Sequence, residues 1–467
     1  MQAFDKVVKS IGNWVIYNIA RYEGYQRTFH LEEDGIILSL RSKEVSNRQL
    51  RSPFFIELML IIFLVEFLKG SLLVALLPIY MKNSLGLTAW SVGVAFSLQY
   101  VGDNLFRSPF GWLAERLGYK KTMSGALIMT VIAVVIIAFT SAPVWLAIAC
   151  LILGIGTSPL WPCAMTGVTE ISGPNNSNGT AIGALEMASL MGIGAGPIAM
   201  NFLMQRTGSN YHTSFLVLIG CGIVLVLVAL LLPGKAKSIN LHTTVEEVRH
   251  TNILMLIKSK IVLLIKSVKK TLYEVKHTLK VSWLVYPALF LQSFVIGILT
   301  PVITLYVQNE LGFSPNMYSL LLIAGGGITV IALIPCGKLI DRFGTAPFLH
   351  CGFLLAAVSI SIFSMVHSVP LVFTFVALIG ISYAFILPGW NTYVSHLVPK
   401  GERGAVWGFF LTLQGSGMVV GPIVSGRLWD VMGHEAPFIA SSVVMVILFI
   451  VHLLLTRKSP PKMKAVS

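Results

Sequence analysis

The sequence has little charge. Only 12% of its 467 residues are Asp, Glu, Lys or Arg, whereas 55% are hydrophobic and the mean hydropathy is +0.79; soluble proteins carry about 25% charged residues. It also lacks a cysteine pattern, because its five cysteines all lie in apolar runs without metal-ligand or CxxC spacing. These features argue against a soluble enzyme, a disulfide scaffold and a metal centre. We expect no cleavable signal peptide, because a mostly polar stretch precedes the first long apolar run.

Long apolar runs dominate the rest of the chain. A helix that crosses a bilayer needs about 20 mostly apolar residues, and the sequence offers twelve such runs, which predict an all-α membrane protein with twelve transmembrane helices. The predicted spans are 54–81, 89–111, 121–142, 144–170, 177–203, 213–233, 282–307, 316–337, 347–366, 369–395, 403–426 and 436–456.

The distribution of Lys and Arg predicts the orientation. With both termini in the cytoplasm, 29 of the 34 basic residues fall in cytoplasmic segments and only three in outer loops. Positive loops are retained on the cytoplasmic side. The net charge of +14 is therefore explained by topology, and nucleic acid is not an expected partner. The expected location is the bacterial plasma membrane.

The regions outside the spans define the expected domains. They are a cytoplasmic N-terminal segment 1–52, a six-helix half 53–233, a linker 234–280, a second six-helix half 281–456 and a cytoplasmic tail 457–467. Within the linker, residues 254–276 place apolar residues at helical spacing among lysines. This pattern predicts an amphipathic helix on the anionic lipids of the inner leaflet; a solvated tether between the halves is the alternative.

The two halves resemble each other. At an offset of 226, or one residue either side, Gly154 matches Gly380 and the pair Leu85–Gly86 matches Leu311–Gly312. Matches occur in order along both halves, which indicates an internal repeat. Parallel six-helix halves with a substrate site between them are the architecture of major facilitator transporters.

Two kinds of motif resemble that superfamily. GWLAERLGYKK and GKLIDRFG are similar to its loop motif, in which an acid and a base can pair across neighbouring helix ends. GIGAGP and GSGMVVGP are similar to its glycine-proline motif, in which small residues permit close helix packing; packing alone is the alternative for these glycines. The conformational residues expected from the motifs are Gly111, Glu115, Arg116, Gly118, Gly337, Asp341, Arg342, Gly344, Gly196, Pro197, Gly421 and Pro422.

Ionisable residues within the spans are candidate functional residues, because charge inside a membrane is costly. Glu66 and Lys69 share one helix face, as do Asp103 and Arg107, so each acid has a base on its own helix. Glu186 lies in the fifth span. Mutually neutralising structural pairs are the alternative interpretation.

The repeat predicts a charged wall and an apolar wall. Glu66 maps to Gln292, and the second half is nearly neutral within its spans. A cavity between such halves suits an amphiphile whose head group contacts the charged residues. Aromatic and amide side chains typical of sugar contacts lie at similar depth, although Trp also fills helix interfaces. They are Trp161, Trp390, Asn391 and Tyr393.

Several strings carry a closer resemblance. VEFLKG, YVGDNLFRSPFG, GIGTSPLW and especially LPGWNTY with WGFFLTLQGSGMVVGPIVSG resemble the proton-coupled flippases of Gram-positive bacteria that move the lipoteichoic-acid glycolipid anchor. The resemblance implies export of a diglucosyl-diacylglycerol type lipid to the outer leaflet, driven by proton entry. It implies no cofactor, with the proton as coupling ion, and glycolipid or lipoteichoic-acid synthesis enzymes as partners.

The site residues implied by the resemblance combine with those expected from their depth in the spans. Proton coupling is assigned to Asp103, Glu66, Arg107 and Lys69. Substrate binding is assigned to Glu66, Lys69, Asp103, Trp161, Glu186, Gln292, Trp390, Asn391 and Tyr393. Two other functions are compatible with the sequence: a proton-coupled multidrug exporter, and a non-transporting membrane scaffold for lipid-synthesis enzymes. A membrane enzyme is disfavoured, because no nucleophile–base pair, metal cluster or phosphate loop stands out.

Overall fold

The computed structural model describes residues 52–172, 179–232, 282–397 and 403–458, and all regular structure within these ranges is helical. The first half contains α3 (Pro53–Lys69), α4 (Leu77–Ile79), α5 (Ala89–Leu117), α6 (Tyr119–Phe139), α7 (Pro143–Thr157), α8 (Leu160–Ser172), α9 (Gly179–Arg206) and α10 (Tyr211–Leu231). The second half contains α12 (Val285–Leu305), α13 (Pro315–Phe343), α14 (Thr345–Phe363), α15 (Val369–Leu397), α16 (Arg403–Met432) and α17 (Ala436–Lys458). π-Helical turns at Gly70–Leu76 and Tyr80–Ser84 join α3 and α4 into one long helix, and another at Tyr306–Glu310 extends α12.

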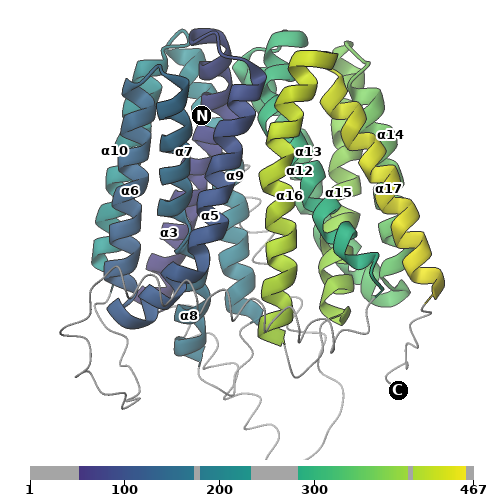
Figure 1. Ribbon diagram of the computed structural model, residues 1–467, viewed down its shortest axis with the longest axis horizontal. Coiled ribbons are helices and arrows are strands. Elements are labelled where there is room, and N and C mark those ends of the chain that lie inside the picture. Colours follow the sequence, from purple (N-terminus) through teal and green to yellow (C-terminus); the bar gives the residue numbers. More distant parts are fainter. Residues whose placement is uncertain (1–51, 173–178, 233–281, 398–402, 459–467) are drawn as a thin grey trace, which may run out of the picture.

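The helices run side by side in two groups (Figure 1). Those of the first half, purple to teal, lie on one side of the molecule, and those of the second half, green to yellow, lie on the other. The short connections 85–88, 311–314 and 433–435 meet at one end, which we call the upper end because it is uppermost in Figure 1. The lower end carries the start of α3 and the last turn of α17.

Helix ends at repeat-related positions are built alike. Thr88 and Ser314 cap α5 and α13, because each side-chain oxygen accepts a hydrogen bond from the backbone N–H three residues on. Gly118 and Gly344 separate α5 from α6 and α13 from α14 with φ of 84° at both, a conformation that favours glycine. The internal repeat therefore extends to the details of the backbone.

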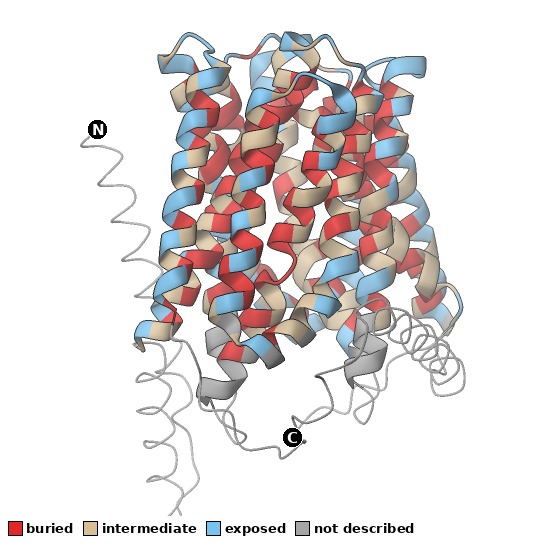
Figure 2. Ribbon diagram, turned by 60° about the vertical axis from the view of Figure 1, so that its left-hand side comes forward, coloured by how far each residue is buried: buried red, intermediate tan, exposed pale blue. Residues whose placement is uncertain are grey.

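Eleven of the described helical segments are long and apolar enough to cross a membrane. α5 is not among them, although the sequence predicts a span there, because polar residues such as Gln99, Asp103 and Asn104 lower its hydropathy. Many large apolar side chains are exposed. Figure 2 shows exposed and intermediate residues, in pale blue and tan, on the outer sides of the helices and buried residues, in red, between them. An apolar exterior of this kind is suited to lipid.

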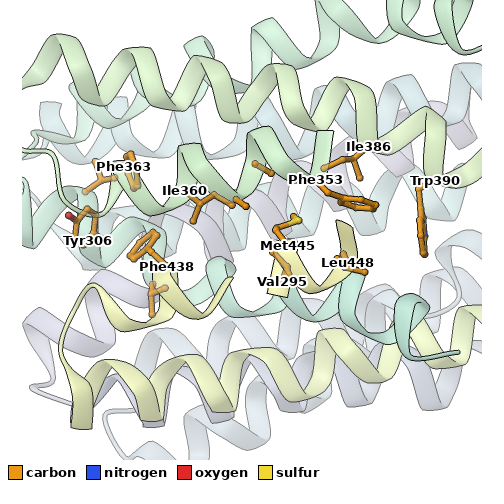
Figure 3. Close-up of a cluster of buried hydrophobic side chains, with 14 of the residues drawn as sticks. Val295, Tyr306, Phe353, Ile360, Phe363, Ile386, Trp390, Phe438, Met445 and Leu448 are labelled. Carbon is orange, nitrogen blue, oxygen red and sulfur yellow. The ribbon is translucent and has the colours of Figure 1, made fainter. Parts of the chain in front are cut away.

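Each half has its own apolar interior. Two clusters of buried residues occupy the first half, and one large cluster occupies most of the second and also includes Ile79 and Ala89 of the first. Figure 3 shows part of the second-half cluster, in which Tyr306, Phe363 and Phe438 pack together near one end and Phe353 and Trp390 near the other. Because most of each cluster lies within one half, each half is suited to move as a unit.

The fourth predicted span corresponds to one candidate span, Pro143–Met165, with a local interruption. The predicted helix 144–170 is broken into α7 and α8 at Ser158 and Pro159. Proline lacks the backbone N–H that would continue the helix. The predicted amphipathic helix 254–276, residues 1–51 and most of the predicted tail lie outside the described residues.

Candidate functional site

Both predicted acid–base pairs form, one on α3 and one on α5. On α3, Lys69 Nζ lies 3.4 Å from Glu66 Oε1, and on α5, Arg107 Nη2 lies 3.1 Å from Asp103 Oδ2. Glu66 is only 5% exposed. The spacing of three and four residues brings each pair to one helix face. The charge of Lys69 also interacts with Asp103 and with Tyr100, so the two pairs form one electrostatic group.

The local backbone places Glu66 and Lys69 where α3 and α9 lie close together. α3 passes into a π-helical turn at Gly70, directly after Lys69, and such turns are frequent at functional sites. Gly192 of α9 abuts the carbonyl of Phe63 and Cβ of Glu66, so a side chain there would collide with α3. Close packing therefore fixes the helix that carries the acid.

A cavity of about 270 Å³ lies between the two halves at this charged group. The first half supplies most of its wall, and the second half supplies residues of α12 and α16. The lining residues are Glu66, Lys69, Tyr100, Asp103, Asn104, Arg107, Thr157, Leu160, Trp161, Ser293, Leu411, Gln414, Gly415 and Met418. A polar group in this cavity would meet two carboxylates, a lysine and an arginine.

Five of the predicted site residues line the cavity, and the others lie elsewhere. Trp390 and Tyr393 pack against each other inside the second half, with ring centroids 5.9 Å apart, and Asn391 is exposed. Gln292 is buried beside the cavity and accepts a hydrogen bond from the Ser293 hydroxyl at 3.2 Å. Glu186 is exposed on α9 and lies close enough to Glu66 for the two carboxylates to interact.

Several lining residues that the sequence did not predict lie on two helix faces. The α5 face consists of Tyr100, Asp103, Asn104 and Arg107, and the α16 face consists of Leu411, Gln414, Gly415 and Met418. Both sets have the spacing i, i+3, i+4 and i+7, which is one face of a helix. Extending the helical face of Asp103 would have found the first set. The second set contains no charge and gave no signal of that kind.

Among the motif residues, the glycine-proline pairs make the closest packing. Gly196 abuts Phe67 and Ser71 of the same half, and Gly421 abuts Gly297 of α12. The side chains of Glu115 and Arg116 lie outside the described residues. In the second copy of the loop motif, Asp341 and Arg342 are exposed and form no ion pair with another described residue.

Hydrogen bonds join the two halves toward the upper end. Asp430, beyond the cavity on α16, accepts from the backbone N–H groups of Ala89 and Trp90 at 3.1 and 2.8 Å. Asn83 and Asn309 exchange two side-chain hydrogen bonds of 3.0 and 2.9 Å. The negative carboxylate of Asp430 also suits the positive end of α5. The halves are thus fastened on the upper side of the cavity.

Within the described residues, no group of three or more His, Cys, Asp or Glu side chains is placed to hold a metal ion. The ionisable groups of the cavity are themselves paired acids and bases. Their arrangement can bind and release a proton and can contact a polar ligand.

The chain is similar to known membrane transporters. The family model described as Major Facilitator Superfamily matches residues 58–284 and 285–467. A protein of Staphylococcus saprophyticus named proton-coupled antiporter flippase LtaA is 26% identical over 384 residues, which cover 80% of this chain and 87% of the relative. The protein of the same name from Staphylococcus aureus strain MSSA476 is 25% identical over 382 residues, with the same coverage.

Solved structures show the same fold at low sequence identity. The nucleoside transporter NupG is 15% identical with a TM-score of 0.65, covering 87% of this chain and 100% of that chain. A bacterial homologue of the human lysosomal transporter Spinster, in an inward-facing and unoccupied conformation, is 16% identical with a TM-score of 0.65, covering 89% and 99%. These likenesses support the architecture of two packed helical halves.

Proposed function

The chain belongs to the Major Facilitator Superfamily, and from this premise we propose that it is a proton-coupled antiporter that flips a glycolipid from the inner to the outer leaflet. The superfamily and the apolar helices make it a multi-pass membrane protein, in a bacterium of the plasma membrane. The observation that carries the proposal is the cavity with two acid–base pairs on the first-half wall. The names of the staphylococcal relatives point to the same activity.

The cavity suits an amphiphile with a polar head. Glu66, Asp103 and their bases offer charged donors and acceptors on one side, and Trp161 offers an aromatic face on which a sugar ring stacks. Leu411 and Met418 make the facing wall mainly apolar. The head group would lie against the first half while the acyl chains follow apolar surface. The proposed lipid is of the diglucosyl-diacylglycerol type.

Proton binding would act through the acid–base pairs. Protonation of Asp103 removes the charge that holds Arg107 at 3.1 Å, and protonation of Glu66 does the same for Lys69. The freed base is then left without its partner, which changes the relative stability of the two conformations of the transporter. Exposure of the acid to the opposite side would release the proton and reset the pair.

The proposed topology counts α5 as a membrane span, giving twelve, with both termini in the cytoplasm. The lower end would then face the cytoplasm and the upper end, fastened by Asp430 and by Asn83 with Asn309, would face outward. The excess of Lys and Arg in the segments at the lower end supports this orientation. In this conformation the outer side of the cavity is closed. Residues 254–276 are proposed to contact anionic lipids of the inner leaflet, and lipid-synthesis enzymes are proposed partners.

Flipping of a fluorescent diglucosyl-diacylglycerol in proteoliposomes, with and without an imposed pH gradient, tests the proposal. We expect the purified protein to flip the lipid faster with the gradient. Asp103→Asn and Glu66→Gln should each reduce the gradient-driven rate to that of protein-free liposomes, because a neutral amide cannot take up and release a proton.

A control variant separates coupling from folding. Glu435→Gln removes a charge in the exposed connection between α16 and α17, outside the cavity and outside the motifs, and should leave the rate unchanged. Gradient-independent flipping by the parent, or full gradient-driven activity of both acid variants, would contradict the proposal. Efflux of ethidium without flipping would favour the multidrug exporter.

A further inference from the structure

The second half contributes few polar groups to the cavity. Its lining residues are Ser293 of α12 and four residues of α16. Among those four, only Gln414 has a polar side chain. The Ser293 hydroxyl already donates a hydrogen bond to Gln292. Gln414 therefore stands out as the polar group that the opposite wall presents to a ligand.

The side-chain amide of Gln414 is available for hydrogen bonding. Gln414 is half-buried and forms no hydrogen bond with any other described residue, and neither its amide oxygen nor its nitrogen is sealed from the cavity. An amide offers two N–H donors and a carbonyl acceptor. In a space that closes around a ligand, leaving these groups without partners would be costly. This arrangement indicates that the Gln414 amide binds a polar ligand and does not stabilise the fold through a contact of its own.

The backbone around Gln414 is held close to the charged helix. At the neighbouring Gly415, the side chain of Asn104 of α5 occupies the space where a Cβ would lie. Asn104 adjoins Asp103 in the chain and is itself fixed by donating to the carbonyl of Tyr100 at 2.8 Å. Gln414 and the acid–base pair of α5 thus lie on facing helices beside a close contact between the two halves.

α16 is also firmly seated in its own half. Gly417 abuts the backbone of Phe290, and Gly421 abuts Gly297, both on α12. Glycines at these positions let the helix backbones pack without intervening side chains. Gln414 therefore moves with the second half as a whole, and a ligand bound to it is bound to that half.

We propose that Gln414 is the residue of the second half that recognises the lipid head group. Its side-chain amide hydrogen-bonds the hydroxyl groups of a neutral sugar, and Asp103 and Glu66 of the first half bind the opposite side of the same sugar. This inference rests on the proposed glycolipid function. A sugar hydroxyl both donates and accepts, so it can satisfy a carboxylate on one wall and an amide on the other. Such a ligand joins the two halves, whereas an uncharged lipid without hydroxyl groups on its head does not.

Binding measurements on the full chain in nanodiscs test this assignment. The probes are diglucosyl-diacylglycerol and a sugar-free diacylglycerol of the same acyl chains whose remaining hydroxyl group is capped as a methyl ether. Gln414→Met keeps the length of the side chain and removes its hydrogen-bonding groups, so we expect affinity for the diglucosyl lipid to fall about tenfold. Affinity for the diacylglycerol should not change.

Ser416→Ala is the matched control. Its hydroxyl donates to the carbonyl of Leu413 within α16, and the residue does not line the cavity, so both affinities should equal those of the parent. Gln414→Ala gives a second test in case the methionine distorts the wall, and thermal melting of each variant reports its folding. Loss of affinity for the diglucosyl lipid alone in both Gln414 variants supports the assignment.

Two results would overturn it. Unchanged affinity of the Gln414 variants for the diglucosyl lipid shows that the amide does not contact the sugar, and an equal loss for both lipids shows that Gln414 only shapes the wall. If the parent protein itself fails to bind the diglucosyl lipid while remaining folded, the proposed function fails first and this assignment falls with it. The parent thus distinguishes the two failures.

Discussion

The two halves of the molecule share a backbone design but differ in what that design carries. In the first half, Gly154 of α7 abuts the carbonyl of Gln99 and the backbone nitrogen of Asp103. In the second half, Gly380 of α15 abuts the equivalent positions, Gly325 and Thr329. The same close contact between helices is therefore made twice, at positions 226 residues apart.

The side chains at this repeated contact have different roles. Asp103 points to Arg107 and into the cavity, whereas the Thr329 hydroxyl donates to the backbone carbonyls of Gly325 and Gly380. One half keeps a charge available, and the other uses its polar group to hold two helices together. The difference teaches that the repeat specifies the scaffold, while individual side chains assign binding and coupling to one half.

The largest effect is expected from giving the first half the chemistry of the second. Lys69→Val copies Val295 and leaves the buried Glu66 without its base, so we expect a loss of about 3–5 kcal/mol of stability. The double variant Glu66→Gln with Lys69→Val copies Gln292 and Val295 and removes both charges. It should recover most of that stability but not gradient-driven transport. Thermal unfolding in detergent and flipping in proteoliposomes measure the two effects separately.

If Lys69→Val alone were as stable as the double variant, the pair would not be an energetic unit. Equally, gradient-driven transport by the double variant would remove Glu66 from the coupling mechanism and leave Asp103 alone in that role.

The next effect concerns how closely the halves approach. A Cβ at Gly93 of α5 would fall on the carbonyl of Pro422 of α16, across the boundary between halves. Gly93→Ala should destabilise the closed upper end by about 1–3 kcal/mol through overpacking. Gly194→Ala on α9, where no atom lies within 4 Å of the added Cβ, is the matched control and should be neutral or stabilising. Thermal unfolding and the rate of lipid flipping report both.

Equal effects of the two alanines would show that helix propensity rather than contact between the halves decides the outcome. Close contact between the repeated scaffolds would then not be what stabilises the upper end.

A smaller effect is expected for Asn83 and Asn309, which occupy equivalent positions in the two halves. Asn83→Ala and Asn309→Ala each break both hydrogen bonds of the exchange, so the second change should cost little once the first is made. A double-mutant cycle on thermal stability should give a coupling free energy of about 1 kcal/mol. Additive losses would mean that each amide acts through other neighbours.

The smallest effect is expected inside the second half. His452 is 1% exposed, neither ring nitrogen has a partner, and its ring lies 4.8 Å from that of His350 and 5.1 Å from that of Tyr393. His452→Phe keeps an aromatic ring and removes two unsatisfied polar atoms, so thermal stability should be unchanged or raised by about 1 kcal/mol. A fall in transport without a fall in stability would instead give the second half a proton-binding role.

The sequence predicts the scaffold well because its determinants are local and repeated. Apolar runs of span length, the repeated glycines and the loop motifs identify the helices, and Gly118 and Gly344 do adopt the left-handed conformation that suits only glycine. Hydropathy does not predict the break at Pro159, because a single proline hardly changes the mean hydropathy of a continuous apolar run. In α5, Asp103 and Arg107 pair with each other at the cavity between the halves, which explains how a charged segment keeps its place.

The site was harder to predict than the fold. Glu66, Lys69, Asp103 and Arg107 stand out because charge is rare in a span, and all four line the cavity. Gln414 carries no charge, and its importance arises only from the helix that faces it. Trp390 and Tyr393 do not line this cavity, and their ring neighbours are Phe353 and His452 inside the bundle, so their predicted sugar contacts stay a prediction.

The exchange between Asn83 and Asn309 has a meaning for the origin of the chain. The two residues are separated by 226 positions, the offset of the repeat, so each amide meets its own counterpart on the axis that relates the halves. In a symmetric pair of separate six-helix subunits, a single asparagine codon would create both hydrogen bonds at once. The contact is therefore of the kind that a homodimer can acquire in one mutational step, and gene fusion would preserve it without further change.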